Sequence, residues 1–264
     1  MAIPDVKKYI RQETMPTPFC RGCGHGILLR AVLIAIDELG MDFKNMLFVS
    51  GIGCAAWIPS PHYAADTLHT THGRPIAYAT GAKLFNPKLD VVVISGDGDI
   101  LSIGGNHLIH AARRNMDIKV IMANNRVYGM TGGQLASTTP HGGITATTPE
   151  GNPERDFDAC RLVLACGADY VARQSVAEPR KLIAIIKKAL QYKGFAFVEA
   201  MTTCPTHYGR MNKMPVPHEM IEDLKRISVA GTRAQVMAGD APEGKIYVGE
   251  FVNDTGVRPL PASR

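Results

Sequence analysis

The sequence predicts an α/β fold, an open, doubly wound, mostly parallel sheet with helices on both faces. Its short apolar runs, such as those at 46–50 and 91–95, are continuous rather than alternating, which is typical of parallel strands covered on both faces. Helical segments separate these runs, and such alternation favours a doubly wound sheet. Glycine and cysteine clusters follow several of the runs, at the ends of strands where ligands bind in sheets of this kind.

The expected elements follow one another in regular order. The first is an apolar helix that stops at Gly40, because glycine commonly terminates helices. A histidine- and threonine-rich loop precedes the second helix, and strands and helices then alternate as far as residue 200. The predicted strands are 46–50, 91–95, 118–123, 169–172 and 195–200, and the predicted helices are 26–39, 74–85, 102–114, 153–166 and 176–192.

Two long segments rich in glycine, proline and threonine, 131–152 and 203–217, contain no predicted element. Loops of this length in a compact domain are usually functional or lie at interfaces. We predict a main domain at 1–210 and a C-terminal extension at 211–264 that packs on the same domain or on a partner. The extension is expected to contain one helix after Pro217 and then a tail with little pattern.

Composition bounds the function only coarsely. The chain has 264 residues, of which 45% are apolar and 20% charged, and a formal net charge of +5, all ordinary for a globular protein with a sizeable core. There is no run of 18 or more apolar residues, so no membrane span is expected. The N-terminal residues lack the apolar stretch of a signal peptide, and no basic run favours nucleic-acid binding. The expected location is the cytoplasm, where thiols stay reduced.

A glycine-flanked aspartate marks a candidate magnesium site. Gly96-Asp97-Gly98 follows a predicted strand and precedes a helix, and Asn125 lies 28 positions after Asp97, at the end of the next strand. Glycines let the backbone approach phosphate oxygens, and a helix N-terminus favours negative charge. Mg²⁺ prefers oxygen ligands and takes some from substrate phosphates. We expect Asp97, Asn125 and the carbonyl of Val127 to bind Mg²⁺. The tripeptide alone is also typical of an ordinary β-to-α turn.

Four of the six cysteines form a candidate metal centre. Cys20 and Cys23 make a C-x-x-C pair in a glycine-rich loop, whereas Cys54 and Cys204 each follow a predicted strand. Four thiolates can hold a tetrahedral Zn²⁺ or a [4Fe–4S] cluster. Two distant single cysteines are less typical of structural zinc, which usually uses two local pairs. Four unrelated cysteines remain a third alternative.

The Gly-Asp-Gly to Asn-Asn arrangement resembles the thiamine diphosphate motif of that cofactor's large enzyme superfamily. This resemblance implies the same Mg²⁺ ligands that the spacing predicts. It further implies that Gly98 and Asp99 contact the diphosphate, with Gly129 and Met130 beside the same group.

A second resemblance is carried by the C-x-G-C-G-H-G loop at 20–26, the G-I-G-C turn at 51–54 and the T-C-P loop at 203–205. Together, and in this order, they resemble the β subunits of 2-oxoacid:ferredoxin oxidoreductases, over roughly residues 17–210. The resemblance implies a [4Fe–4S] cluster bound by Cys20, Cys23, Cys54 and Cys204. It also implies cofactor contacts at four consecutive residues and a diphosphate contact farther along the chain: Ile52, Gly53, Cys54 and Ala55, and His72.

Four further polar residues lie outside these assignments. His25 could form a hydrogen bond near the cluster or simply pack, and Arg74 could balance phosphate charge or lie on the surface. Cys160 and Cys166 fall in a predicted apolar helix, so we expect both to be buried as small hydrophobic side chains.

The family resemblance implies an oxidoreductase that is active only with partner chains. Thiamine diphosphate supplies an electron sink for decarboxylation of a 2-oxoacid, coenzyme A takes the acyl group, and ferredoxin takes the electrons. Related enzymes need a glutamate beside the aminopyrimidine ring, on a second domain for which this chain has little room. It also lacks the C-x₂-C-x₂-C-x₃-C-P runs of two-cluster ferredoxins. An α-type subunit and ferredoxin-like γ or δ subunits are therefore expected, in a dimer of heteromers.

The expected substrate is 2-oxoglutarate, because segments 128–134 and 204–210 are most similar to the 2-oxoglutarate-type β subunits. Some family members carry a lysine in the place of Gly132, and its absence leaves branched-chain, aryl and pyruvate-type 2-oxoacids as alternatives. Two alternatives lie outside this activity: a non-oxidative thiamine decarboxylase or synthase, and a non-catalytic zinc-stabilised binding subunit. The four cluster cysteines argue against the first, and the visible absorbance of an iron–sulfur protein would separate the second.

Overall fold

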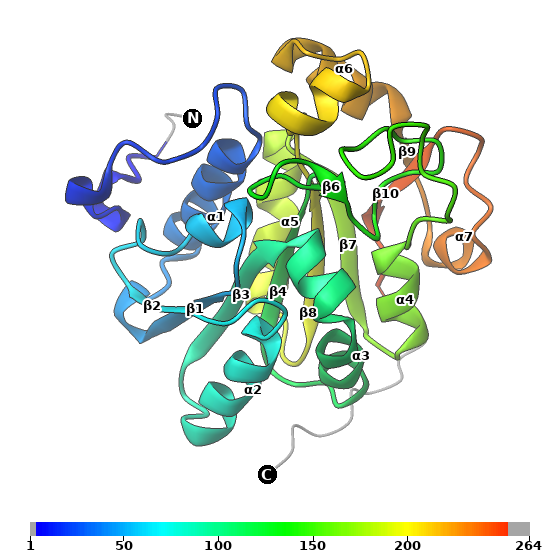
Figure 1. The fold of residues 1–264 in the computed structure, drawn as a ribbon. Coiled ribbons are helices and arrows are strands. Elements are labelled where there is room, and N and C mark those ends of the chain that lie inside the picture. Colours follow the sequence, from blue (N-terminus) through cyan, green and yellow to red (C-terminus); the bar gives the residue numbers. More distant parts are fainter. Residues whose placement is uncertain (1–3, 253–264) are drawn as a thin grey trace.

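The computed structural model describes residues 4–252 and has three layers, with a sheet between two layers of helices (Figure 1). The main sheet has the order β2-β1-β3-β4-β8-β7-β10-β9. Its strands are β1 Met46–Ser50, β2 Asp66–His69, β3 Asp90–Gly96, β4 Lys119–Asn124, β7 Tyr170–Ser175, β8 Ala196–Met201, β9 Ser228–Ala230 and β10 Ile246–Glu250. A separate hairpin pairs β5 Val127–Tyr128 with β6 Gln134–Leu135.

Six neighbouring strands of the sheet, from β2 across to β7, run parallel. This confirms the predicted fold class. At the far edge, β10 pairs antiparallel with β7, and β9 pairs parallel with β10. Because parallel strands point in one direction, the carboxyl ends of β1, β3, β4 and β8 open onto the same edge of the sheet.

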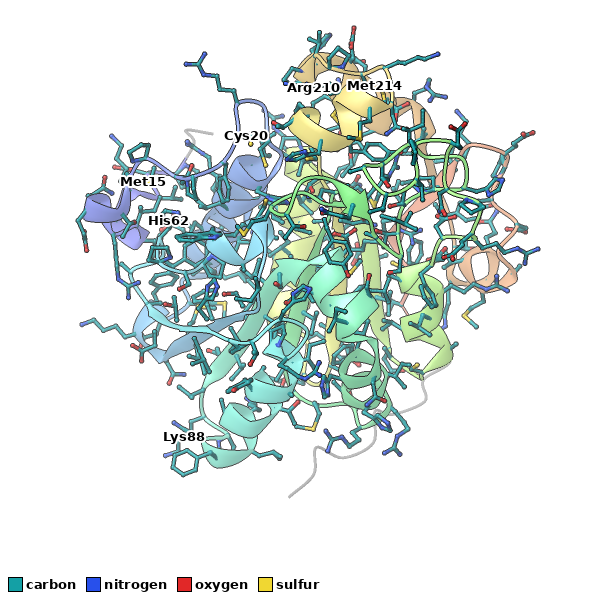
Figure 2. All side chains as sticks on the ribbon, in the orientation of Figure 1. Met15, Cys20, His62, Lys88, Arg210 and Met214 are labelled. Carbon is teal, nitrogen blue, oxygen red and sulfur yellow. The ribbon has the colours of Figure 1, made fainter. Side chains whose placement is uncertain are left out.

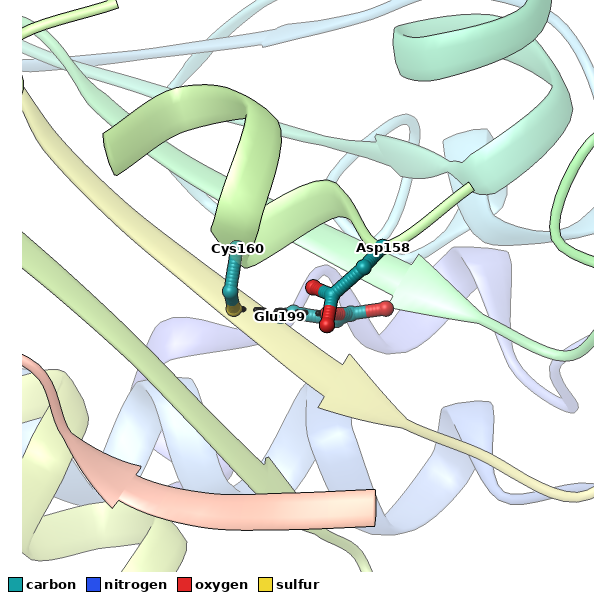
Figure 3. A group of neighbouring side chains, drawn as sticks. All are labelled: Asp158, Cys160 and Glu199. Carbon is teal, nitrogen blue, oxygen red and sulfur yellow. Dashed lines mark hydrogen bonds between the residues drawn. The ribbon is translucent and has the colours of Figure 1, made fainter. Parts of the chain in front are cut away.

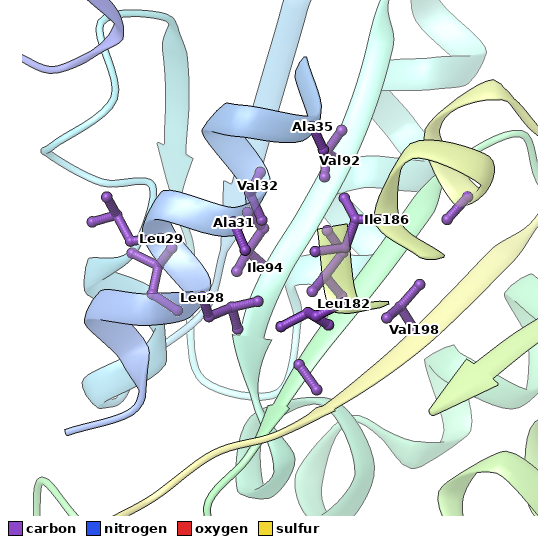
Figure 4. Packing of buried hydrophobic residues seen from close by; sticks show 14 of the residues in the cluster. Leu28, Leu29, Ala31, Val32, Ala35, Val92, Ile94, Leu182, Ile186 and Val198 are labelled. Carbon is purple, nitrogen blue, oxygen red and sulfur yellow. The ribbon is translucent and has the colours of Figure 1, made fainter. Parts of the chain in front are cut away.

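The continuous apolar run of β3 is explained by its two covered faces. Val92 and Ile94 belong to the core cluster on one face, and Val91 and Val93 to the cluster on the other, because successive strand residues point to opposite sides. Helices α1 His25–Leu39 and α5 Pro179–Gln191 cover the first face. Figure 4 shows their side chains meeting those of the strands there, including Leu28, Val32, Ile94, Leu182, Ile186 and Val198.

The second face is covered by α2 Pro75–Phe85, α3 Gly105–Arg113, α4 Ala159–Ala165 and α7 Arg233–Ala238. Helix α6 Pro217–Ile227 adds two buried side chains to the first cluster, and a third, partly buried, packs against it. Short turns complete the list: η1 Lys7–Tyr9, η2 Gln12–Thr14, η3 Phe43–Asn45, η4 Cys54–Trp57, and the π-helical turns η5 Gly98–Ile103 and η6 Pro205–Gly209. Within residues 4–252, none of the helices is long and apolar enough to cross a membrane.

Three predicted helices begin clearly later in the structure, and the helix expected at 176–192 begins at Pro179. The helix expected at 153–166 begins only at Ala159, because Asp158 caps it by accepting a hydrogen bond from the N–H of Arg161 at 3.0 Å. The helix expected at 102–114 is divided at Gly104 into η5 and α3. A Cβ at Gly104 would lie 2.5 Å from the carbonyl oxygen of Asp99, so the chain can turn this closely only with glycine.

Two parts of the sheet were not predicted. Strand β2 is an edge strand whose residues are mostly exposed, so it lacks the apolar run that marks a buried strand. The tail expected after α6 instead contains β9, α7 and β10. These elements are 3, 6 and 5 residues long, too short to establish a clear periodicity.

Replacing Leu33 by alanine should lower the free energy of unfolding by about 2–5 kcal/mol, because this fully buried side chain of α1 would leave a cavity. Leu84→Ala is the matched control, since Leu84 is also helical but 52% exposed, and it should change the free energy by no more than about 0.5 kcal/mol. Urea unfolding followed by circular dichroism measures both. Equal losses would contradict the burial of α1 against the sheet.

Candidate functional site

Two adjoining cavities lie where β1, β3, β4 and β8 end. The first, of about 190 Å³, is lined by residues that follow β1, β3 and β4. The second, of about 250 Å³, lies between the N-terminal loop, the turn after β1 and the loop after β8. They share five lining residues: His25, Cys54, Asn125, Gly129 and Met130. A larger cavity of about 480 Å³, between α4 and the C-terminal segment, contains none of the predicted site residues.

Asp97 lines the first cavity and is 2% exposed. Its carboxylate accepts a hydrogen bond from the hydroxyl of Thr138. Burial raises the pKa of Asp97 to about 6, and the hydrogen bond from Thr138 opposes part of this rise. A buried carboxylate is unfavourable unless a cation or several donors stabilise it. The position therefore suits a metal ligand.

The turn after β4 brings two more oxygen-bearing groups to the same cavity. Asn125 and Val127 line it, and the side-chain oxygen of Asn125 accepts a hydrogen bond from the N–H of Val127 at 3.2 Å. Between them, Arg126 has a left-handed backbone with φ of +65°. The hydroxyl of Thr139 donates to the carbonyl of Arg126 at 2.7 Å. The turn is thus held by the long loop that follows it.

Asp99 joins the loop after β1 to the loop before α2. One oxygen of its buried carboxylate accepts hydrogen bonds from the N–H groups of Gly73, at 2.6 Å, and Ile52, at 3.3 Å. The same oxygen lies 2.7 Å from Nδ1 of His72. A Cβ at Gly51 would lie 1.9 Å from the other oxygen. The carboxylate therefore faces the two loops, and the absence of a side chain at Gly51 makes room for it.

Tyr128 closes one side of the first cavity. Its hydroxyl donates to the carbonyl of Gly98 at 3.3 Å, and its ring lies 6.0 Å from that of His72. A Cβ at Gly98 would lie 2.3 Å from the Tyr128 ring. Glycine at position 98 is thus required by the packing of this wall, as well as by the close approach to phosphate that the sequence predicts.

The second cavity gathers the four cysteines of the predicted metal centre. Cys20 is exposed, whereas Cys23, Cys54 and Cys204 are partly buried, and all four line the cavity. A Cβ at Gly129 would lie 3.6 Å from the sulfur atoms of both Cys54 and Cys204. The fold thus brings the four cysteines to one place, although 184 positions separate the first, Cys20, from the last, Cys204.

Hydrogen bonds hold the N-terminal cysteine loop against the segment after β8. The hydroxyl of Thr203 donates to the carbonyl of Gly22 at 3.0 Å, and the N–H of Gly24 donates to the carbonyl of Thr203 at 3.1 Å. Figure 2 shows Cys20 on this loop, at the same end of the molecule as Arg210. The cysteine pair and the last cysteine therefore meet through backbone contacts of their own loops.

Burial raises the pKa of the Cys23 thiol to about 12 and that of Cys54 to about 11, and the charges of neighbouring cysteines add to both shifts. Burial also raises the pKa of Cys204. These thiols therefore stay protonated in the protein alone. Metal ligation requires thiolates, so a cation bound in this cavity would displace their protons.

His25 lies between the two cavities and is 1% exposed. Burial lowers the pKa of its imidazole to about 4, so the ring is neutral. Its ring packs edge-on against Phe19, with 5.7 Å between the centroids. Neither ring nitrogen has a hydrogen-bond partner among residues 4–252. Buried polar atoms are almost always paired, so the unpaired nitrogens fit a site that binds a further polar group.

Comparison with known proteins gives a consistent result. The family model for the thiamine pyrophosphate enzyme C-terminal TPP-binding domain matches residues 51–200. The 2-oxoglutarate synthase subunit KorB of Methanothermobacter thermautotrophicus is 52% identical over 254 residues, which cover 96% of this chain and 87% of the relative. The 2-oxoacid:ferredoxin oxidoreductase subunit beta of Saccharolobus solfataricus is 43% identical, over 72% of this chain and 62% of its own. The chain belongs to the β-subunit family of the 2-oxoacid:ferredoxin oxidoreductases.

A solved structure is similar over nearly the whole chain. It is described as 2-oxoglutarate:ferredoxin oxidoreductase from Magnetococcus marinus with 2-oxoglutarate, coenzyme A and succinyl-CoA bound. The TM-score is 0.86 at 32% identity, and the match covers 98% of this chain and 88% of that one. The family resemblance and the α/β fold inferred from sequence are both confirmed.

The fold of this β subunit brings the predicted site residues together. The first cavity is lined by all twelve of the predicted Mg²⁺ and cofactor residues: Ile52, Gly53, Cys54, Ala55, His72, Asp97, Gly98, Asp99, Asn125, Val127, Gly129 and Met130. The four predicted cluster cysteines line the second. Arg74 lies outside both linings, and its guanidinium donates to the carbonyl of Gly73 at 3.1 Å. What these residues bind stays a prediction.

Sequence reasoning missed the residues that support the site. Thr138, which donates to Asp97, lies in the long loop at 131–152, and loop length was the one signal that marked it. The two remaining cysteines differ in burial. Cys160 is fully buried in the core, as predicted, whereas Cys166 is only partly buried.

Asp99→Ala should loosen the loops at 51–53 and 71–74, because it removes the acceptor of the Gly73 and Ile52 N–H groups. Leaving a buried donor unpaired costs about 1–3 kcal/mol. Hydrogen exchange read by mass spectrometry should therefore become faster in both loops, with a smaller effect in Asp99→Asn, which keeps an acceptor oxygen. Unchanged exchange in both variants would show that other contacts hold the loops.

Proposed function

We propose that this chain binds thiamine diphosphate, Mg²⁺ and a [4Fe–4S] cluster, and that with partner subunits it oxidatively decarboxylates 2-oxoglutarate. The substrate would lose CO₂ and two electrons, coenzyme A would take the succinyl group as a thioester and release its thiol proton, and two ferredoxins would accept one electron each. The observation that carries the proposal is the pair of adjoining cavities, one with a Gly-Asp-Gly turn and one with four cysteines, that share five lining residues.

The fit to Mg²⁺ rests on the donor set of the first cavity. Asp97 offers a buried carboxylate whose pKa is raised by burial, and a dication would stabilise its charged form. Asn125 and the carbonyl of Val127 offer neutral oxygens from the neighbouring strand end. Such a mixed oxygen set suits Mg²⁺, which completes its octahedron with phosphate and water oxygens.

The fit to thiamine diphosphate rests on the backbone around Asp97. Gly98 begins a π-helical turn that leads into α3, so its N–H belongs to a helix start that favours a diphosphate. His72 is held near Asp99 and lines the same cavity. We propose that Asp99 acts on the diphosphate through its backbone and positions His72 and the Ile52 loop with its carboxylate. When bound, the cofactor supplies the electron sink for decarboxylation.

The fit to a [4Fe–4S] cluster rests on how the cysteines are spread. A single zinc with bonds of about 2.3 Å would hold its sulfurs roughly 3.8 Å apart. Among residues 4–252, no three of the four cavity sulfurs all lie within 4.8 Å of one another. The three potential ligand side chains that meet this distance are Asp158, Cys160 and Glu199, which lie elsewhere. A larger cluster is thus favoured over the zinc-stabilised alternative, and when bound it supplies one-electron transfer.

The need for partners is supported by the rim that the two cavities share. Ile52, Trp57 and Met130 are 41%, 37% and 49% exposed at the mouths of the two cavities, and apolar groups at such a rim favour a covering protein surface. We propose that an α-type subunit covers this rim and supplies the glutamate for the aminopyrimidine ring. Ferredoxin-like γ or δ subunits then complete a dimer of heteromers, and the complex is cytoplasmic.

The choice of 2-oxoglutarate is supported by the relatives' names. Subunits named for 2-oxoglutarate are 50–52% identical over 93–96% of this chain in three methanogens, and the similar solved structure is described with 2-oxoglutarate and succinyl-CoA bound. Branched-chain, aryl and pyruvate-type substrates are the alternatives that the assay must separate.

The assay is coenzyme A-dependent reduction of ferredoxin by the complex, purified without oxygen after co-expression with the neighbouring subunit genes. We expect 2-oxoglutarate to give the highest kcat/KM among 2-oxoglutarate, pyruvate, 2-oxoisovalerate and phenylpyruvate. The isolated chain should be inactive. Full activity without partners, or a clear preference for another 2-oxoacid, would overturn the corresponding part of the proposal.

Cys204→Ser should remove most of the iron from the chain, because one of four thiolate ligands is lost while three remain. The unmodified chain should hold about four irons and four sulfides. Cys166→Ser is the matched control, since Cys166 lies outside the cavity and should keep the full iron content. Iron, sulfide and visible absorbance are measured. Stoichiometric zinc without iron in the unmodified protein would refute the cluster.

A further inference from the structure

A row of buried polar side chains crosses the sheet directly behind the proposed Mg²⁺ turn. Asn124 ends β4, Glu199 lies on β8 and Arg173 on β7, three strands that are neighbours in the sheet. The side-chain N–H₂ of Asn124 donates to one oxygen of Glu199 at 2.7 Å. Nε of Arg173 donates to the other oxygen of Glu199 at 2.7 Å. The three residues are 4%, 2% and 5% exposed.

The first member of the row shapes the turn that holds the proposed ligands. The side-chain oxygen of Asn124 accepts a hydrogen bond from the N–H of Arg126 at 3.0 Å. Arg126 has a left-handed backbone, with φ of +65°, which costs about 1–3 kcal/mol for a residue with a side chain and persists only when its surroundings enforce it. The bond from the Arg126 N–H to Asn124 spans Asn125 and fixes the turn that leads to Val127. Asn125 and Val127 are the two residues proposed to offer neutral oxygens to Mg²⁺.

The second member has a specific chemical requirement. Both oxygens of Glu199 accept hydrogen bonds, one from Asn124 and the other from Arg173, and the thiol of Cys160 lies 3.4 Å from the second oxygen as a further donor. A carboxylate offers acceptors on both sides, whereas a carboxamide offers one acceptor and one donor. Glutamine at this position would therefore set a donor against a donor on one side. Only the carboxylate can hold Asn124 and Arg173 at once.

The neighbours of Glu199 do not form a second metal site. Figure 3 shows Asp158, Cys160 and Glu199 with their ligand atoms turned toward one another. Arg173 already pairs with both carboxylates, through Nε to Glu199 and through a terminal nitrogen to Asp158 at 2.5 Å. The guanidinium supplies the positive charge that a metal would otherwise bring. The group is thus an ion-pair network that fixes the orientation of Glu199.

The far end of the row reaches the C-terminal segment. The remaining terminal nitrogen of Arg173 donates to the carbonyl of Tyr247 on β10 at 3.1 Å. Since β10 lies beside β7, next to the edge strand β9, the row spans four adjacent strands. A chain of hydrogen bonds through Arg173, Glu199 and Asn124 therefore connects the C-terminal segment to the Mg²⁺ turn.

We infer that Glu199 is a positioning residue for the Mg²⁺ site: by holding the Asn124 side chain, it keeps Arg126 in the left-handed conformation that presents Asn125 and Val127 to the metal. This inference rests on the proposed function, because it assumes that the turn binds Mg²⁺ together with thiamine diphosphate. Replacing a residue that hydrogen-bonds directly to a metal ligand typically changes metal affinity by about 10- to 100-fold. Glu199 acts one hydrogen bond farther out, through Asn124, so we expect a shift at the lower end of this range.

The test uses the purified complex after removal of thiamine diphosphate and Mg²⁺. Isothermal titration calorimetry measures cofactor binding over a series of Mg²⁺ concentrations. Glu199→Gln should raise the Mg²⁺ concentration for half-maximal cofactor binding by about 10-fold, and excess Mg²⁺ should restore binding. A merely structural role would lower the amount of folded protein without moving this Mg²⁺ midpoint, so an unmoved midpoint would overturn the inference.

Asp117→Asn is the matched control. Asp117 also pairs with two lysines, Lys119 at the start of β4 and Lys83 on α2, but it lies at the end of β4 opposite to Asn124. The Asp117→Asn variant should have a lower free energy of unfolding and an unchanged Mg²⁺ midpoint. Should Glu199→Gln fail to assemble, Asn124→Ala tests the same link, because it removes the acceptor of the Arg126 N–H and should raise the midpoint similarly.

A double variant separates this role from the proposed function itself. With Asn124→Ala already present, adding Glu199→Gln should not raise the Mg²⁺ midpoint further, since Glu199 acts through Asn124; additive shifts would refute that route. Asp97→Ala in the same assay should abolish Mg²⁺-dependent binding. If Asp97→Ala has no effect, the proposed Mg²⁺ site is wrong. If it abolishes binding while Glu199→Gln leaves the midpoint unchanged, only the inference fails.

Discussion

Four parallel strands that end at one edge determine most of what this molecule can do. Because β1, β3, β4 and β8 run in one direction, the loops that follow them must share a limited space at their carboxyl ends. Two carboxylates, a carboxamide and four thiols are placed there by segments between residues 20 and 204. Polar groups gathered in a buried space need partners, and the details of the site follow from how each group finds one.

The two neighbouring aspartates show that the same type of side chain can have different roles, depending on its hydrogen-bond partners. Asp99 is surrounded by donors from two loops, so its charge is used to hold the protein together. Asp97 lines the first cavity, and burial raises its pKa although the Thr138 hydroxyl and nearby backbone N–H groups donate to it, so a cation in this cavity would stabilise its charged form further. They are two positions apart, yet the turn at Gly98 directs them to different surroundings. The spacing along the chain identified Asp97 and the superfamily resemblance identified Asp99 as site residues, but only the fold separates their roles.

The sequence was sufficient for the parts of the fold that depend on burial on both faces. The run 91–95 predicted β3 because both of its faces are apolar, and the glycine at position 40 predicted the end of α1. Strand β2 and the elements after α6 escaped prediction because they are short or exposed. The same limit applies to the site. Its lining residues carry recognisable motifs, whereas supporting residues such as Thr138 and Glu199 are recognisable only once distant segments are brought together.

The close fit of Gly51 against the Asp99 carboxylate limits how this sequence can vary. Any side chain at position 51 would place its first carbon 1.9 Å from that carboxylate, so position 51 cannot change while Asp99 keeps its place. A change at Asp99 alone would leave two loop N–H groups without their acceptor. Position 51 can therefore accept a side chain only after Asp99 has changed or moved. The pair is thus expected to be inherited as a unit, although 48 positions separate its members.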